Sequence, residues 1–284
     1  MATGIHGGSE ERVHRAKSAD GTEVVGRVIG QGPPVVLLPA GPGSSETSWG
    51  HVVPALSRHC TCYLMNTRNR GLSEHSSDLS PQRLVEDVVA YAESIGQPVG
   101  LVGWGSALWV PVVAEKSSAF SAVAAYEPGA LEKGEEIAED FENAMTQMGN
   151  LAAEGRLIEG ARGFVEASAE VGLYTEVDLR QGGAFDFWEE AASDIPVLLQ
   201  ELQLAAESEL PSPTDPSVLA RVSVPVMLLR GSNTGNWFVD SVEYVADHLP
   251  ESRIREISGA GHFGPYTKAQ QVAEELANFF GQRT

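Results

Sequence analysis

Val99-Gly100-Leu101-Val102-Gly103-Trp104-Gly105-Ser106-Ala107 is the stretch of sequence that decides the fold. Its apolar beginning predicts a buried strand over 99–102, and its glycines predict a tight turn into a helix from about Ser106. Comparable apolar runs lie at 35–38, 62–65 and 122–126, with helical patterns between the later ones. This alternation predicts an α/β fold with a mostly parallel central sheet and helices on both faces.

The pattern changes between residues 130 and 212, where acidic helical segments follow one another without strands. Pro211-Ser212-Pro213 ends this stretch like a linker. Strand and helix patterns then resume, with strands at Val224–Leu229 and Arg253–Ile257 and a final amphipathic helix. We therefore predict a core domain of residues 1–129 and 213–284, and an inserted helical cap, or lid, of residues 130–212.

Composition limits the class of protein and its partners. The chain has 284 residues, 42% of them hydrophobic, which suits one globular core with an insertion. No apolar run approaches the roughly 20 residues that span a bilayer, and the polar N-terminus resembles no signal peptide, so we expect a cytoplasmic protein without a membrane partner. A net charge of −20 argues against binding nucleic acid. Cys60 and Cys62 are expected to be buried thiols, and no histidine spacing predicts a metal site.

Three further motifs occur in an order and spacing that resemble the α/β-hydrolase family. Leu38-Pro39-Ala40-Gly41-Pro42-Gly43 is similar to the oxyanion loop of that family. Arg68-Asn69-Arg70-Gly71-Leu72-Ser73 resembles its Arg-Gly-x-Gly-x-Ser turn, and Gly259-Ala260-Gly261-His262-Phe263 resembles the motif that carries its catalytic histidine. The resemblance covers nearly the whole chain except the cap. It implies an α/β-hydrolase fold and an enzyme of small-molecule metabolism.

The turn that should carry the catalytic nucleophile departs from the family. One register aligns Gly103-Trp104-Gly105-Ser106-Ala107 with Gly-x-Ser-x-Gly and places Gly105 at the nucleophile. A second register matches Trp104-Gly105-Ser106-Ala107-Leu108 to the elbow of haloalkane dehalogenases and places Gly103 where their aspartate belongs. We favour Gly103, because Glu127 then follows it in the sequence at the spacing that separates the nucleophile from the acid in several of those dehalogenases. In both registers the nucleophile position is vacant, which excludes a covalent intermediate on that residue.

The acid that the family places late in the chain is also missing. The loop Gly231-Ser232-Asn233-Thr234-Gly235 offers only Asn233, which carries no charge, and Asp240 is expected on the following helix. Glu127, at the carboxyl end of a buried strand, then becomes the natural partner of His262. Its carboxylate would orient the imidazole and make it a general base. In the alternative interpretation, Glu127 is a surface carboxylate and His262 only a hydrogen-bonded residue.

The resemblance also implies a pocket with backbone donors. The oxyanion hole would use the N–H of Trp104, in the favoured register, and that of Ala40 or Gly41. Trp104 matches the dehalogenase tryptophan that donates its indole N–H to the halide, so Trp104 and Trp49 are candidates to line the pocket, with core packing as the alternative. Phe187-Trp188, from the cap, is expected to close the pocket from above.

These features predict an atypical, cofactor-independent enzyme that acts on a small molecule. In the leading hypothesis, a Glu127–His262 dyad is the general base for elimination, cyclisation, cofactor-free oxygenation or water attack on an apolar or aromatic compound. Cofactor-independent dioxygenases of this fold use such a dyad. Two alternatives stay open: hydrolysis of an ester, epoxide or lactone by water that His262 activates directly, and a non-catalytic small-molecule binding protein. Ser106 is expected to cap or pack the helix, and a homodimer is left open.

Overall fold

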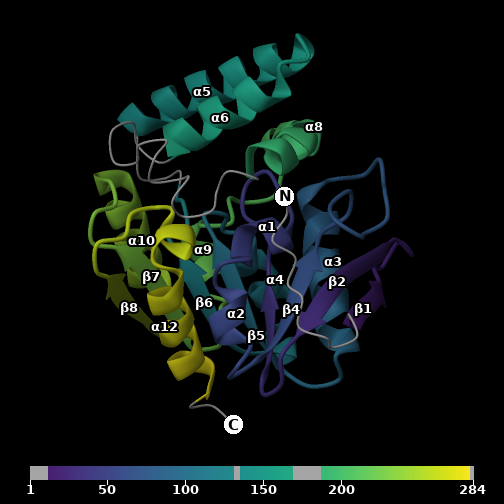
Figure 1. Cartoon of the computed structure of the whole chain (residues 1–284), viewed down its shortest axis with the longest axis vertical. Helices are drawn as coiled ribbons and strands as arrows, with labels where there is room; N and C mark the ends of the chain where they lie inside the picture. Colours follow the sequence, from purple (N-terminus) through teal and green to yellow (C-terminus); the bar gives the residue numbers. More distant parts are fainter. Residues whose placement is uncertain (1–11, 131–134, 169–186, 282–284) are drawn as a thin grey trace.

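The structure is a computed structural model that describes residues 12–130, 135–168 and 187–281 (Figure 1). Within these residues, the central sheet has eight strands in the order β1-β2-β4-β3-β5-β6-β7-β8. The strands are β1 (Arg12–Lys17), β2 (Glu23–Ile29), β3 (Pro34–Leu37), β4 (Thr61–Asn66), β5 (Val99–Trp104), β6 (Phe120–Tyr126), β7 (Val226–Gly231) and β8 (Ser252–Ile257).

The sheet is parallel from β4 to β8, whereas β1 and β2 pair antiparallel with their neighbours. Every residue of β5 is buried, as a strand covered on both faces requires. The predicted α/β fold with a mostly parallel sheet is therefore confirmed. One boundary differs, because β5 continues to Trp104 instead of ending at Val102.

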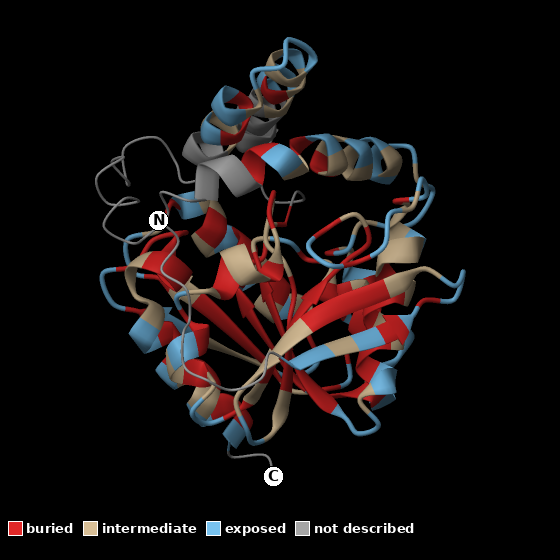
Figure 2. Ribbon diagram, turned by 45° about the vertical axis from the view of Figure 1, so that its right-hand side comes forward, coloured by how far each residue is buried: buried red, intermediate tan, exposed pale blue. Residues whose placement is uncertain are grey.

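Helices cover both faces of the sheet, so its strands are buried between them (Figure 2). The core helices are α1 (Ser45–Trp49), α2 (Val53–Leu56), α3 (Pro81–Ser94), α4 (Trp109–Glu115), α9 (Pro216–Leu219), α10 (Asn236–His248), α11 (Gly264–Thr267) and α12 (Ala269–Gly281). One hydrophobic cluster joins α2 and α12 to the sheet, and a second joins α3, α4, α9 and α10 to its other face. Cys60 and Cys62 are buried free thiols, as expected.

Among the described residues between β6 and β7 there are three long helices: α5 (Glu135–Ala153), α6 (Leu157–Ser168) and α8 (Phe187–Ala206). Figure 1 places them above the edge of the sheet at which the parallel strands end. Side chains of all three helices join the hydrophobic cluster that contains α2 and α12, and Arg70 Nη2 donates a hydrogen bond to Glu201 Oε2 on α8 at 2.8 Å. These helices fall within the predicted cap of residues 130–212; treatment of that segment as a separate domain stays a prediction. No helix in the described part of the chain is long and apolar enough to cross a membrane.

Candidate active site

Glu127 follows the last residue of β6 and is fully buried. Its backbone is left-handed, with φ of 43°, which is uncommon for a residue with a side chain. Both carboxylate oxygens are hydrogen-bonded: Gly231 N–H donates to Oε1 at 2.7 Å, and Thr234 Oγ1 donates to Oε2 at 2.9 Å. Since strained backbone persists only where its surroundings hold it, these bonds account for the fixed position of the carboxylate.

His262 lies in the loop between β8 and α11, where its imidazole reaches the same carboxylate. Its Nδ1 is 2.9 Å from Glu127 Oε2, and its side chain is 10% exposed. Because an ionised carboxylate only accepts hydrogen bonds, the proton between these atoms belongs to Nδ1. In the neutral ring, Nε2 is then the acceptor nitrogen, and among the described residues no group donates a hydrogen bond to it. The structure therefore brings together the two residues that the sequence predicted as partners.

Gly105, rather than Gly103, lies against the imidazole. Gly105 has a φ of 68°, and a Cβ atom added to it would lie 3.6 Å from both Cε1 and Nε2 of His262. Gly103 is inside β5, and a Cβ atom there would lie 3.0 Å from Trp109 Cδ1. The favoured placement of the vacant position at Gly103 is therefore wrong. Because the strand runs two residues further than expected, the sharp turn forms at Gly105.

The two tryptophans predicted to line the pocket instead pack in the core. Trp104 is 4% exposed, and its indole N–H donates to the backbone carbonyl of His262 at 3.0 Å. Trp49 is fully buried, and its indole N–H donates to the carbonyl of Leu38 at 2.7 Å. Both side chains belong to the hydrophobic core, which favours the core-packing alternative, and neither indole N–H is left to donate to a substrate. Trp104 supports the loop that carries His262 from inside the core.

The expected backbone donors of an oxyanion hole were the N–H groups of Trp104 and of Ala40 or Gly41, and Trp104 is the last residue of β5. Ala40 N–H donates to Ser48 Oγ at 2.9 Å. Ser106 N–H, which follows Gly105, donates to the carbonyl of Trp104 at 2.7 Å in a γ-turn. Gly41 N–H has no acceptor among the described residues, and a Cβ atom at Gly41 would lie 3.5 Å from Phe164 on α6. Of these donors, Gly41 N–H is the one available to a substrate oxygen.

The Ser106 side chain is hydrogen-bonded within its own turn. Its side chain accepts a hydrogen bond from Leu108 N–H at 3.2 Å, just before α4 begins at Trp109. This is a local turn and not the helix cap expected for Ser106, because α4 begins three residues later than predicted and its N-cap is Leu108. The turn from 105 to 108 therefore contributes backbone geometry to the site and no nucleophilic side chain beside His262.

Two residues of the site were missed by the sequence analysis. Thr234 binds Glu127, and Phe238 on α10 stacks on the His262 ring with centroids 3.9 Å apart and planes 9° from parallel. Asn233 and Asp240, the residues considered in this region, are both exposed. The position of Thr234, in the loop where the family places its late acid, is a signal that could have identified it. Phe238 carried no such signal.

Other expected features lie outside the described residues or are not found among those described. The side chains of Phe187-Trp188, predicted to close the pocket, belong to the part of the chain that is not described. Among the described residues, no group of three His, Cys, Asp or Glu side chains could hold a metal ion. The chemistry of the described site is therefore that of a carboxylate–imidazole pair beside a glycine.

Comparison with known proteins identifies the family. The model of the alpha/beta hydrolase family matches residues 35–275. A Mycobacterium tuberculosis protein named "Putative non-heme bromoperoxidase BpoC" is 24% identical over 270 residues, which cover 88% of this chain and 95% of that protein. An alpha/beta hydrolase from Sphaerobacter thermophilus superposes with a TM-score of 0.74 and 21% identity, over 94% of this chain and 100% of that one. A bromoperoxidase from Bacillus anthracis superposes with a TM-score of 0.73 and 20% identity, over 95% of this chain and 100% of that one. The eight-stranded sheet has the α/β-hydrolase fold, and this chain belongs to the alpha/beta hydrolase family.

Proposed function

We propose that this protein is an α/β-hydrolase-fold enzyme without a covalent nucleophile, in which the Glu127–His262 dyad acts as a general base. The relatives named as bromoperoxidases and hydrolases support enzymatic activity in general. The specific proposal rests on one observation. His262 Nε2 faces the position where a side chain on Gly105 would begin, while Nδ1 is bound by a buried carboxylate.

The dyad would remove a proton from the substrate. The proton of an activated C–H or O–H group passes to His262 Nε2, and the negative charge of Glu127 stabilises the imidazolium that forms. A positioned base of this kind accelerates a reaction by about 10²- to 10⁴-fold. If the substrate develops charge on a carbonyl oxygen, Gly41 N–H is the available donor for it. With glycine at residue 105, no bond forms between that residue and the substrate.

We infer that the substrate is small and uncharged, with apolar or aromatic character. The aromatic side chains of Phe238 and Phe164 lie beside His262 and Gly41, respectively, which favours apolar or aromatic substrates. The net charge of −20 opposes the approach of anions. Elimination, cyclisation and cofactor-free oxygenation each begin with proton abstraction from such a molecule. For elimination and cyclisation this site would supply the base, and cofactor-free oxygenation would in addition need dioxygen as the co-substrate that is reduced.

A second candidate function is hydrolysis by a directly activated water. Leaving out its own chain neighbours, a Cβ atom at Gly105 would meet no described atom within 4 Å except Cε1 and Nε2 of His262. A water there would lie at the acceptor nitrogen of the base. It would lose a proton to Nε2 and attack an ester, epoxide or lactone without a covalent intermediate.

The test compares the wild-type protein with His262→Ala, Glu127→Gln and His59→Ala, the last being an exposed histidine that serves as control. Each protein is incubated with a fluorophosphonate, p-nitrophenyl esters, epoxides and enolisable aromatic ketones, and its intact mass is recorded. We expect no covalent adduct on any protein, and turnover of one compound class that is lost only in the two dyad variants.

The alternatives give different results. Ester or epoxide turnover without an adduct, dependent on His262, would favour activated water. A covalent adduct on the wild-type protein would contradict the absence of a nucleophile. Binding of these compounds with no turnover of any of them would mean that the protein is a binding protein built on a hydrolase fold.

A further inference from the structure

Aromatic side chains surround the imidazole of His262 on several sides. Phe238 lies parallel to it, with centroids 3.9 Å apart and an interplanar angle of 9°. Phe263 is edge-on, at 5.6 Å and 88°, and Trp104 is tilted, at 5.9 Å and 51°. Of these three contacts, only that with Phe238 covers a ring face at stacking distance. Phe238 therefore determines the plane of the imidazole more directly than the other two.

The hydrogen bond to Glu127 restrains this plane only in part. It holds Nδ1 of His262 near the carboxylate, but the torsion that rotates a histidine ring is broad and has no sharp energy minimum. A modest rotation would lengthen the contact between Nδ1 and the carboxylate and carry Nε2 away from Gly105. Face-to-face contact with a fixed neighbour removes this freedom, because rotation would push the two rings into each other. The stacking partner is therefore the group that directs Nε2.

Phe238 is itself well fixed. It is 3% exposed and lies in the first turn of α10, where its N–H donates to the carbonyl of Gly235 at 3.1 Å. Trp237 packs against it with centroids 4.7 Å apart. Thr234, which binds Glu127, lies one residue before Gly235. One short segment of chain thus holds the acid through a hydrogen bond and the base through a ring contact.

We propose that Phe238 is a positioning residue that holds the His262 imidazole in the plane that directs Nε2 over Gly105. The expected effect of Phe238 on kinetics rests on the proposed function of the dyad. The expected effect of Phe238 on the ring position does not rest on it, since the ring position is a property of the protein without substrate. Two independent readouts therefore separate a failure of this inference from a failure of the proposed function.

The first readout is NMR of protein labelled with ¹³C in its histidine rings. The chain has seven histidines, and the signal lost in His262→Ala identifies the relevant one. Ring current from the stacked phenyl group should shift the His262 ring protons upfield in the wild type. Phe238→Leu should abolish that shift, whereas Phe238→Tyr should retain it. Phe120→Leu, a buried phenylalanine at the opposite end of β6, serves as the control and should leave it unchanged. An unchanged His262 signal in folded Phe238→Leu would overturn the inference.

The second readout is steady-state kinetics with the compound that the wild type turns over. Because an aromatic pair contributes about 0.5–1.5 kcal/mol beyond buried area, Phe238→Leu should lower kcat roughly 3- to 10-fold. KM should stay constant, Phe238→Tyr should restore kcat, and Phe120→Leu should match the wild type. A wild-type kcat in Phe238→Leu would overturn the positioning role. Turnover that persists in His262→Ala would instead contradict the proposed function, while the NMR comparison would still decide whether Phe238 sets the ring plane.

Discussion

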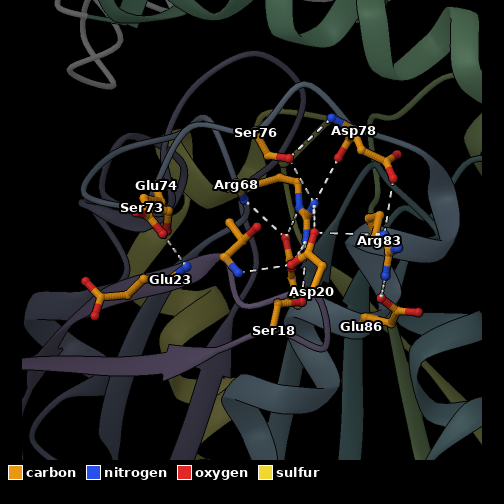
Figure 3. Close-up of polar contacts among 12 residues, drawn as sticks. Ser18, Asp20, Glu23, Arg68, Ser73, Glu74, Ser76, Asp78, Arg83 and Glu86 are labelled. Carbon is orange, nitrogen blue, oxygen red and sulfur yellow. Dashed lines mark hydrogen bonds and ion pairs between the residues drawn. The ribbon is translucent and has the colours of Figure 1, made fainter.

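Two buried acid–base pairs lie near the carboxyl ends of parallel strands in this protein. They differ in how many nitrogen atoms of the base are hydrogen-bonded to other side chains of the protein. Arg68 follows β4 and pairs with Asp87 on α3, and both side chains are fully buried. Its Nε and Nη2 donate to Asp87 at 2.9 and 2.6 Å, and Nη1 donates to Asp20 at 2.8 Å. Figure 3 shows Arg68 and Asp20 within this network, with Ser76 and other polar groups around them.

The difference separates a structural pair from one available for chemistry. Each side-chain nitrogen of Arg68 has an acceptor, and its hydrogen bonds to Asp87 above all raise the pKa of the guanidinium. No donor remains for a substrate. In the second pair, Nδ1 of His262 is bound by Glu127 while Nε2 faces Gly105. Both pairs are buried, so burial alone does not distinguish them; the proposed base differs because its Nε2 faces Gly105 and is not bound to its partner carboxylate.

The largest expected effect is on stability, at the fully bonded pair. Asp87→Asn should lower the free energy of unfolding by about 3–5 kcal/mol, because it leaves the buried Arg68 without its main counter-charge. Urea denaturation followed by circular dichroism measures this, and turnover per folded molecule should be unchanged. Glu127→Gln is the matched change in the other pair, and it should abolish turnover with a smaller loss of stability. A loss of less than about 1 kcal/mol of unfolding free energy in Asp87→Asn would contradict the structural role of the Arg68–Asp87 pair.

A smaller effect is expected at the hydroxyl that anchors Glu127. Thr234→Val removes one hydrogen bond to a carboxylate, and such bonds contribute about 1.5–3 kcal/mol. The carboxylate should then orient His262 less well, so that kcat falls about tenfold. Thr234→Ser should retain the bond and most of the activity. Thr61→Val removes a hydroxyl that donates to the carbonyl of Gly32 far from the site, and it serves as the control. Equal rates for Thr234→Val and Thr61→Val would show that the anchor is dispensable.

The smallest effect is expected at Asp20, which is 22% exposed. Its hydrogen bond to Arg68 is the main cause that lowers the pKa of Asp20 below its ordinary value of 3.8. Because the folded-state pKa is the lower one, ionised Asp20 stabilises the fold above pH 3.8, and this contribution is lost as the pH falls further. Asp20→Asn should therefore be less stable than the wild type near neutral pH, and the difference should shrink in acid. Urea unfolding across this range measures it; a difference independent of pH would contradict the assignment.

Much of the fold and the central pair of the site could be predicted from the sequence. The apolar runs and the order of strands and helices identified the parallel sheet. Glu127 was expected at the carboxyl end of a buried strand, and His262 was expected as its partner because its loop resembles the histidine motif of the α/β-hydrolase family. The fold prediction depends on periodicity and chain order, whereas the pairing also depends on that resemblance.

Predictions that depended on the local course of the backbone were wrong. The five-residue identity with dehalogenase elbows favoured Gly103, but β5 continues through Trp104, so the turn forms at Gly105. The same extension leaves the indole of Trp104 in the core, bonded to the carbonyl of His262. Phe238 could not be identified, because stacking between residues on separate elements is a tertiary contact that leaves no pattern in the chain.

The central claim is that Gly105 occupies the place of a nucleophile beside an otherwise competent base. A side chain at Gly105 would begin 3.6 Å from His262 Nε2, and the left-handed backbone there is the conformation of a strained nucleophile turn. The most direct test is the intact mass of wild-type, Gly105→Ser and Gly105→Ser/His262→Ala proteins after treatment with a fluorophosphonate. In the reaction, serine oxygen bonds to phosphorus, fluoride leaves and His262 accepts the hydroxyl proton. We predict an adduct on residue 105 of Gly105→Ser alone. An adduct on the wild type, or none on folded Gly105→Ser, would contradict the account.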